Sequence, residues 1–320
     1  PLARALGWLQ GRLAVLLPPF IALLYGTLWW RFGRDPALGS VAVVYEPPGG
    51  LSAAVLGSLL KESVATVTLG ATLVDLAVKG HLRIEPLDRK VLFVPQGRQY
   101  RFTLVTNLQE WKDLSPHEAY LLTHLFPTMT AGERIDTNEM RNSFYMHVPG
   151  FQRLVREAAM GEGFYRLWPT TLRSIAISAG IGGLALVVVV ALKVLPHEIA
   201  QLQLVSDPGL SVLCLLLSLV LILLFGWFMP SRTEKGTEML RQTRGFQEFI
   251  RRVDSPRYSK VIRTPELFER FLPYAMVTGL TKQWAGAFQG IVQAPPTWYV
   301  GSDGPFDVGT FGSTLDACGT

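Results

Sequence analysis

Two long apolar runs stand out in the second half of the chain. Residues Ile175 to Val194 carry one charge, on Lys193, and residues Leu210 to Met229 carry none. About twenty residues of α-helix measure about 30 Å, which is the thickness of the hydrocarbon core of a bilayer. Runs that are apolar on every face for that length are rare in soluble proteins. The pattern therefore predicts a transmembrane hairpin.

A shorter apolar run near the start, Leu13 to Trp30, predicts a further span. Pro18 and Pro19 interrupt this run and are expected to kink its helix. Trp29, Trp30 and Arg31 at its end are typical of a stop-transfer flank. Since the chain opens on Pro1 rather than Met, we expect an upstream part that precedes this span.

The basic residues predict the orientation of these spans. The connection from Pro196 to Pro208 contains no Lys or Arg, whereas several arginines precede Ile175 and follow Met229. Cytoplasmic flanks of membrane helices carry an excess of Lys and Arg. We therefore expect the hairpin turn to lie outside and both large polar segments to lie in the cytoplasm.

The polar segment between the spans begins with the element order of a winged helix. Ser52 is a predicted N-cap for a helix through about Lys61, and Thr68 is a predicted cap for a second helix that ends at Lys79 and Gly80. Two alternating stretches follow and predict strands, His81 to Glu85 and Tyr100 to Val105.

A similar order recurs in the next sixty residues or so. Ser115, Pro116 and Glu118 form the signature of a capping box and open a helix through Phe126. A strand is predicted at Glu133 to Ile135. Thr137 is then expected to cap a helix through Phe144, and a longer helix is expected from about Val148 to Met160. The recurrence predicts two winged-helix-like units in tandem.

The segment after the hairpin is predicted to be helical. Ser231 to Val253 is predicted to form a basic, partly amphipathic helix. Either its first third lies along the anionic inner leaflet, or the helix is an ordinary cytoplasmic one with a solvated basic face. Its predicted apolar face consists of Leu240, Phe246, Phe249 and Ile250. Thr264 and Pro265 open another helix, and Pro273 is expected to kink or break it.

Seven apolar residues of the C-terminal part form a candidate interaction face. They are Phe268, Phe271, Leu272, Trp284, Phe288, Trp298 and Tyr299. An aromatic surface this broad is expected to be buried, because covering three such side chains is worth several kcal/mol at about 25 cal/mol per Å². It either docks onto residues 51–165 of the same chain or binds a partner protein. Trp298 and Tyr299 either anchor the tail or serve as a partner's ligand.

Together these patterns predict a mainly α membrane protein with small β wings. It has three transmembrane helices and a cytoplasmic pair of tandem winged-helix-like units. The expected parts are an extracytoplasmic remnant (1–12), a first span (13–31), a linker (32–50), the winged-helix-like domain (51–166), a second span (174–194), an extracytoplasmic turn (195–208), a third span (209–229), a helical segment (230–293) and a flexible tail (294–320).

Composition and charge narrow the function classes. The chain is 49% hydrophobic and only 17% charged, which favours a membrane protein over a soluble or disordered one. Between Val41 and Gly163 there are 12 basic and 13 acidic residues, a formal charge of −1. Because phosphate backbones attract basic surfaces, this balance argues against nucleic acid as a partner.

The sequence holds no recognisable catalytic or metal-binding pattern. His117 and His124 are seven residues apart, whereas the metalloprotease motif needs a spacing of four to place both imidazoles on one zinc ion. We expect His117 to be solvated in a first helical turn and His124 to be partly buried. Two cysteines, Cys214 and Cys318, supply neither a disulfide framework nor a zinc site. No cofactor and no small-molecule ligand is predicted.

Five segments, in order, closely resemble one family of predicted bacterial membrane proteins, called domain of unknown function 2207. They are WWRFGRDP (29–36), VYEPPGGLS (44–52), ATLVDLAVKGHLRIE (71–85), RGFQEFI (244–250) and FERFLPYAMVTGLTKQWAGAF (268–288). The resemblance covers nearly the whole chain. It implies a multi-pass protein of the bacterial plasma membrane, preceded in the family by an extracytoplasmic β-rich domain, and it brings no activity or catalytic residue.

These observations favour a non-enzymatic adaptor that is anchored in the lipid bilayer and binds an unidentified protein partner. A membrane-tethered DNA-binding regulator is the alternative, and an enzyme of unknown chemistry is the third hypothesis.

Overall fold

The chain folds mainly into helices, as predicted, with one small antiparallel sheet of three strands. The computed structural model describes residues 13–32, 35–87, 99–193, 208–227, 232–254 and 263–300. The chain divides into two compact units, each assembled from two separate stretches of sequence. Unit 1 comprises Pro1–Ala37 with Tyr165–Glu234, and unit 2 comprises Leu38–Phe164 with Lys235–Thr320.

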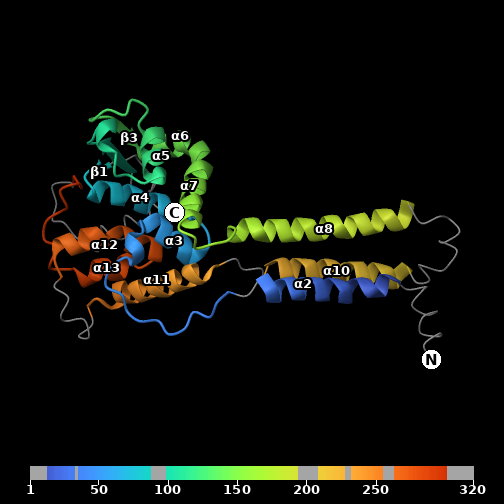
Figure 1. Ribbon diagram of the computed structural model, residues 1–320. Coiled ribbons are helices and arrows are strands. Elements are labelled where there is room, and N and C mark those ends of the chain that lie inside the picture. Colours follow the sequence, from blue (N-terminus) through green and yellow to red (C-terminus); the bar gives the residue numbers. More distant parts are fainter. Residues whose placement is uncertain are drawn as a thin grey trace, which may run out of the picture. The chain divides into compact units, whose positions relative to one another are not determined.

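The described residues of unit 1 include three long helices. They are α2 (Leu17–Phe32), preceded by the 3-10 turn η1 (Leu13–Leu16), α8 (Pro169–Lys193) and α10 (Pro208–Trp227). Helix α10 packs against both α2 and α8, and α2 lies alongside it in Figure 1.

Small side chains on α10 allow these helices to approach closely. The small residues Cys214, Ser218 and Gly226 and the larger Ile222 recur every four residues and are all buried, so they form one stripe on the helix. A Cβ atom added at Gly226 would lie 2.6 Å from the Cγ1 atom of Ile177 on α8. A larger residue at position 226 would therefore push the two helices apart.

Pro18 and Pro19 start a helix rather than kink one. Helix α2 begins at Leu17, so both prolines stand in its first turn. Backbone N–H groups in the first turn have no partner within the helix, and a proline there costs no hydrogen bond. The predicted kink at these residues is wrong for this reason.

The predicted spans correspond only in part to described residues. Residue 194 follows the end of α8, residues 228 and 229 follow the end of α10, and all three lie outside the described residues. So do residues 1–12 and most of the predicted turn, 195–207. Within the part of the chain that the structure describes, no helix combines the length and the apolar character needed to cross a membrane.

Unit 2 opens with the predicted order of helix, helix, strand and strand. The elements are α3 (Ala53–Lys61), after the 3-10 turn η2 (Pro48–Gly50), α4 (Thr66–Val78), β1 (Leu82–Leu87) and β2 (Gln99–Leu104). The side chain of Ser52 caps α3, since its Oγ atom accepts a hydrogen bond from the N–H of Val55 at 3.4 Å. Helix α4 begins at Thr66, so Thr68 lies inside the helix rather than at its cap.

The second half of this segment contributes three helices and one strand. They are α5 (Pro116–Leu125), after the 3-10 turn η3 (Leu108–Glu110), β3 (Arg134–Asp136), α6 (Thr137–Phe144), and α7 (Val148–Gly161), which follows the 3-10 turn η4 (Tyr145–His147). The capping box of Ser115 and Glu118 at the start of α5 is confirmed. At α6 the cap is Asp136 rather than Thr137.

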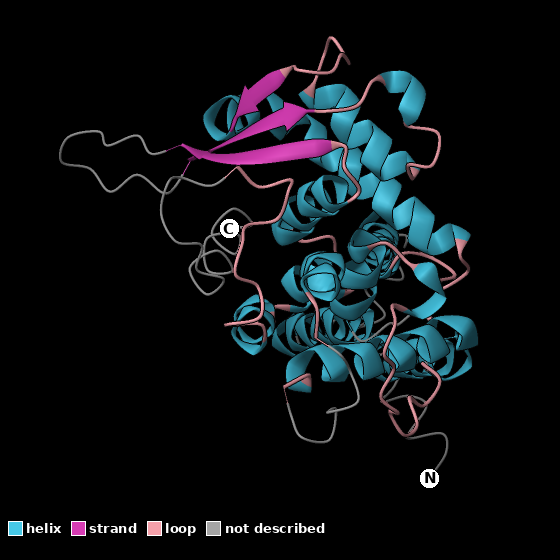
Figure 2. Cartoon of the chain, turned by 90° about the vertical axis from the view of Figure 1, so that its left-hand side faces the viewer, coloured by secondary structure: helices cyan, strands magenta, loops and turns pink. Residues whose placement is uncertain are grey.

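The strands of the two predicted winged-helix-like units form one sheet. Strand β2 is central and pairs antiparallel with β1 on one side and β3 on the other, as Figure 2 shows. Phe102 lies between Ile84 and Ile135 in the register, so one buried apolar row crosses all three strands. The two units therefore share their β structure, because β3 is too short to form a sheet of its own.

The C-terminal part of the chain completes unit 2. It forms α11 (Glu234–Arg252), α12 (Pro265–Thr278) and α13 (Thr281–Ala287). Helix α12 packs against α3 and α4 and continues through Pro273. The predicted apolar face of α11, Leu240, Phe246, Phe249 and Ile250, is buried.

Helix α11 also lies in direct contact with backbone through two glycines. A Cβ atom added at Gly245 would stand 2.0 Å from the carbonyl oxygen of Ala42, and one at Gly236 would stand 2.1 Å from that of Phe164. Backbone atoms on both sides leave no flexible side chain to move away. Glycine is therefore required at both positions for α11 to reach its place.

We expect Gly245→Ala to destabilise unit 2 by about 1–3 kcal/mol, the usual cost of overpacking a filled interior. Gly286→Ala is the matched control. It lies in helix α13, and a Cβ atom there meets nothing within 4 Å. Thermal unfolding of the purified full chain measures both. Equal melting temperatures for the two variants would contradict the close contact at Gly245.

Candidate functional site

The residues of the predicted interaction face gather in the interior of unit 2. Phe268, Phe271, Leu272, Trp284 and Phe288 are all fully buried. The ring centroids of Trp284 and Phe288 are 4.7 Å apart, and the indole N–H of Trp284 donates to the carbonyl oxygen of Phe268 at 3.1 Å. These contacts hold α13 against α12.

Helix α11 also contributes to this aromatic cluster, which its sequence does not indicate. Phe246 and Phe249 stand edge-on to Phe271, with centroid distances of 5.2 and 6.2 Å. Both belong to the predicted apolar face of α11, but nothing in the local sequence pattern indicates which helix that face contacts. The cluster therefore joins three helices rather than two.

Trp298 and Tyr299 fasten the last described residues to the same unit. The indole N–H of Trp298 donates to the Oε2 atom of Glu269 at 2.8 Å. Tyr299 forms a parallel bridge with Ile84 on strand β1, whose N–H donates to the carbonyl oxygen of Trp298 at 2.8 Å. The pair thus anchors the chain up to residue 300 on its own domain, and residues 301–320 lie outside the described residues.

A buried charged cluster lies where α4 and α5 meet. The Nζ atom of Lys79 lies 2.6 Å from the Oε1 atom of Glu118 and 3.0 Å from the Oδ2 atom of Asp75. Glu118 also accepts a hydrogen bond from the N–H of Ser115 at 2.9 Å. One cation thus stands between two carboxylates, and the side chain of Glu118 is almost completely enclosed.

Burial and the attraction between opposite charges together set the pKa values of this charged cluster. Loss of water, opposed in part by Lys79, raises the pKa of Asp75 to about 6. Burial alone would lower the pKa of Lys79 and raise that of Glu118. The attraction between opposite charges outweighs burial in both groups, so the pKa of Lys79 is raised and that of Glu118 is lowered.

His117 adjoins the cluster and is buried, so the prediction that it is solvated is wrong. Its Nε2 atom lies 3.2 Å from the hydroxyl oxygens of both Ser52 and Ser115, and its ring stands edge-on to Phe151. Burial lowers the pKa of His117 to about 4. The first turn of α5 faces the start of α3 rather than water, which a capping motif read from sequence does not reveal.

His124 is partly buried, as predicted, and belongs to a separate group of rings on α5 and η4. Its ring centroid lies 3.9 Å from that of Tyr120 and 4.3 Å from that of His147. Among the described residues, no group of three or more His, Cys, Asp or Glu side chains could hold a metal ion.

The charged cluster is therefore an internal cross-link. Lys79 tethers the end of α4 to the first turn of α5, because its ammonium group bonds both Asp75 and Glu118.

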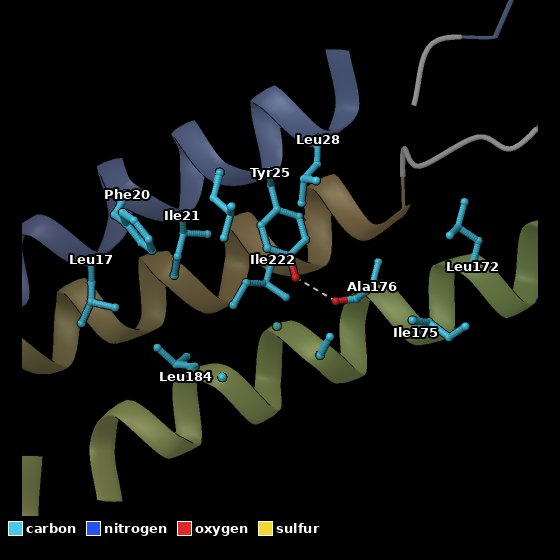
Figure 3. A pocket seen from close by; sticks show the side chains of 14 residues that line it. Leu17, Phe20, Ile21, Tyr25, Leu28, Leu172, Ile175, Ala176, Leu184 and Ile222 are labelled. Atoms are coloured by element: carbon cyan, nitrogen blue, oxygen red, sulfur yellow. Dashed lines mark hydrogen bonds between the residues drawn. The ribbon is translucent and has the colours of Figure 1, made fainter. Parts of the chain in front are cut away.

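Unit 1 contains an apolar groove between α2 and α8, shown in Figure 3. Its volume is about 460 Å³ and Ile222 of α10 lies at its floor. The hydroxyl of Tyr25 donates to the carbonyl oxygen of Ala176 across the groove at 2.8 Å. The lining residues are Leu17, Phe20, Ile21, Leu24, Tyr25, Leu28, Leu172, Ile175, Ala176, Ala179, Gly180, Gly183, Leu184 and Ile222.

For the charged cluster, we expect Lys79→Met to lower the free energy of unfolding at pH 7.5 by about 1–3 kcal/mol, since two enclosed carboxylates lose their cation. The Lys79 side chain is 41% exposed, so solvent keeps this cost below that of a fully buried pair. Lys61→Met, at the exposed end of α3, is the control.

The loss caused by Lys79→Met is expected to shrink as the pH falls to 5. The folded-state pKa of Asp75, about 6, lies above its ordinary value of 3.8, so protonation of Asp75 stabilises the folded state and that contribution is lost as the pH rises from about 4 to 6. A protonated Asp75 no longer needs the cation. Denaturant titrations at both pH values measure the effect, and a loss independent of pH would contradict this account.

Comparisons with known proteins identify a family. The chain matches the family model described as the C-terminal domain of a predicted membrane protein, DUF2207, over residues 42–288. No curated protein and no solved structure matches the chain. Since the match covers most of the sequence and includes unit 2 from residue 42 to the end of the aromatic cluster, the chain belongs to the DUF2207 family of predicted membrane proteins.

Proposed function

We propose that this protein is a non-enzymatic adaptor, with unit 1 embedded in the lipid bilayer and unit 2 serving as a protein-binding domain in the cytoplasm. One observation carries the proposal. Of the large apolar side chains that are exposed among the described residues, 19 belong to unit 1 and only 7 belong to unit 2.

The distribution of these side chains on α10 supports a lipid environment. One face of the helix packs on its neighbours through Cys214 and Ile222, while Leu213, Leu217 and Leu224 are at least 44% exposed. Contiguous apolar surface of this kind marks a membrane or protein contact. The proposal rests on this exposed surface rather than on the length of any single helix.

The small core of unit 1 agrees with this view. Its buried cluster consists of Ile21, Tyr25 and Ile222, with Leu17, Leu184, Leu221 and Phe225 packed around it. In water, the free energy gained by burying these few side chains would have to offset the cost of exposing many more apolar side chains to solvent. In lipid, the exposed side chains carry no such cost, and close contact between small residues holds the helices together.

The charge pattern supports the cytoplasmic location of unit 2. The segment from Pro196 to Pro208 contains no Lys or Arg, and arginines cluster on the far sides of both apolar runs. The wider family is described as a predicted membrane protein, which agrees with an anchored role.

The structure of α4 favours an adaptor over a DNA-binding regulator. Helix α4 occupies the position of a recognition helix, but nine of its thirteen residues are buried. A recognition helix must present side chains to the edges of bases in the major groove. Helix α4 instead packs under α3 and α12, so it has no free face for DNA.

A protein-binding surface on unit 2 is offered by its 3-10 turn η4. Tyr145 and Met146 are each 78% exposed, more than any other large apolar residue in the described chain. Tyr and Met are enriched in the cores of protein interfaces. We therefore propose that the partner protein binds the adaptor at η4, through Tyr145 and Met146.

Cysteine labelling tests the membrane topology. In a background with Cys214 and Cys318 replaced by alanine, Gln201→Cys, which lies outside the described residues, should react with a membrane-impermeant maleimide in intact cells. Gln109→Cys, on exposed η3, should react only after lysis. The reverse pattern would invert the topology, and labelling of both sites in intact cells would contradict embedding.

Site-specific photo-crosslinking tests the adaptor contact. A benzophenone amino acid in place of Tyr145 should give a discrete cross-linked protein species in cells, because this side chain projects from unit 2. The same amino acid in place of Leu108, which is 53% exposed on η3, is the control. A partner contact at η4 would be refuted by an absence of product at position 145 or by the same products at both positions.

A further inference from the structure

The groove of unit 1 has the dimensions of an extended alkyl chain. On α2 it runs from Leu17 to Leu28, about 16 Å, and on α8 from Leu172 to Leu184, about 18 Å at 1.5 Å per residue. In Figure 3, Leu28 and Leu172 stand at one end, and Leu17 and Leu184 stand at the other. Its volume of about 460 Å³ falls within the ordinary range of ligand sites.

The lining makes this groove apolar and narrow. Tyr25 carries the single polar side chain among the lining residues, and its hydroxyl is used by the carbonyl oxygen of Ala176. On α8, small residues take the place of bulky ones and create the space. A Cβ atom at Gly183 would meet nothing within 4 Å, whereas one at Gly180 would clash with the hydroxyl of Tyr25 at 2.3 Å.

The hydrogen bond between Tyr25 and Ala176 limits what can enter. It joins α2 to α8 across the groove at 2.8 Å between the two oxygen atoms. A helix with its side chains is about 10–12 Å wide and does not fit between two helices that are tied in this way. A polymethylene chain, which is much thinner, can lie along the groove above or below the bond.

One end of the groove is basic. Arg31 follows Leu28 by one helical turn in α2, and Arg173 follows Leu172 directly in α8. The guanidinium of Arg173 lies 5.4 Å from the ring centroid of Trp227, in the last turn of α10. Cationic and aromatic side chains at the end of an apolar span are typical of the headgroup region of a membrane.

We propose that this groove binds one acyl chain of an anionic phospholipid, with the lipid phosphate at the end marked by Arg31 and Arg173. The proposal rests on the embedding of unit 1 in the bilayer. The bound acyl chain completes the packing between α2 and α8. These two helices contact each other through Tyr25, and each packs against α10. The lipid is thus a structural ligand of the anchor.

Two adjacent glycines provide a test and its matched control. Gly183 lines the groove, and Gly183→Leu fills the space with an apolar side chain. Gly182 is also in α8 and open to a Cβ atom, but it does not line the groove, so Gly182→Leu changes the same residue type on another face. Both variants replace a helical glycine by a good helix former.

The probe is phosphatidylglycerol with a photoreactive diazirine on one acyl chain, incorporated into nanodiscs that contain the full-length chain. We expect labelled peptides from the lining of α2 and α8, several-fold less labelling in Gly183→Leu, and unchanged labelling in Gly182→Leu. Unlabelled phosphatidylglycerol should compete better than phosphatidylcholine, because the basic end selects a negative headgroup.

The outcomes separate this inference from the proposed function. Equal labelling of the wild-type chain and both variants would overturn the groove site while leaving the embedding intact. Equal competition by the two lipids would overturn the anionic headgroup. Failure of the wild-type chain to remain with membranes after alkaline carbonate extraction would instead overturn the embedding itself, and the groove proposal with it.

Discussion

The packing of α12 onto α3 and α4 is the constraint on which unit 2 depends. Helix α4 is apolar on most of its circumference, so the N-terminal part of the unit has no finished surface without the C-terminal helices. The contact is tight enough that a Cβ atom at Gly57 would stand 2.8 Å from the Cβ atom of Val277. Burial of the large aromatic side chains of α11, α12 and α13 contributes about 1.5–3 kcal/mol for each one. Stretches about two hundred residues apart in sequence therefore fold as one body.

The charged cluster is a consequence of that burial. Once α12 covers α4, Asp75 is removed from water, and an uncompensated carboxylate in that position would be costly. Lys79, four residues further along the chain, forms an ion pair with Asp75 and another with Glu118 at the start of α5. Glu118 in turn holds the backbone of Ser115 in the capping box. A group needed to neutralise a buried acid thus also fixes the position of the next helix.

Unit 1 differs from unit 2 in how its apolar side chains are covered. Its helices touch through small residues, one hydrogen bond and a small apolar cluster around Ile21, Tyr25 and Ile222, and they leave most large apolar side chains facing outward. In water this arrangement would be unfavourable, whereas in a bilayer the surrounding lipid supplies the missing contacts. The groove beside Tyr25 extends the same idea to a single bound chain, since lipid there would act as part of the packing. Under the proposed function, the two units satisfy their apolar surface in two ways, unit 2 through its own core and unit 1 through the surrounding lipid.

The sequence by itself determined the local elements. Capping signals at Ser52, Ser115 and Thr264 placed helix starts, and the family was evident from five short segments, because these depend on neighbouring residues alone. Tertiary structure decided what the elements meet. From sequence, His117 is predicted to be solvated, but the start of α3 lies beside it and buries it. The strands are predicted to form two separate wings, but β3 pairs with β2 in one sheet. Asp75 interacts with Glu118, which is more than forty residues away in sequence. The groove could not be predicted from sequence either, because Leu17, Gly183 and Ile222 share no local pattern and come together only when three helices pack. Periodicity shows which face of a helix is apolar, but the surface that covers it is fixed by contacts between distant residues.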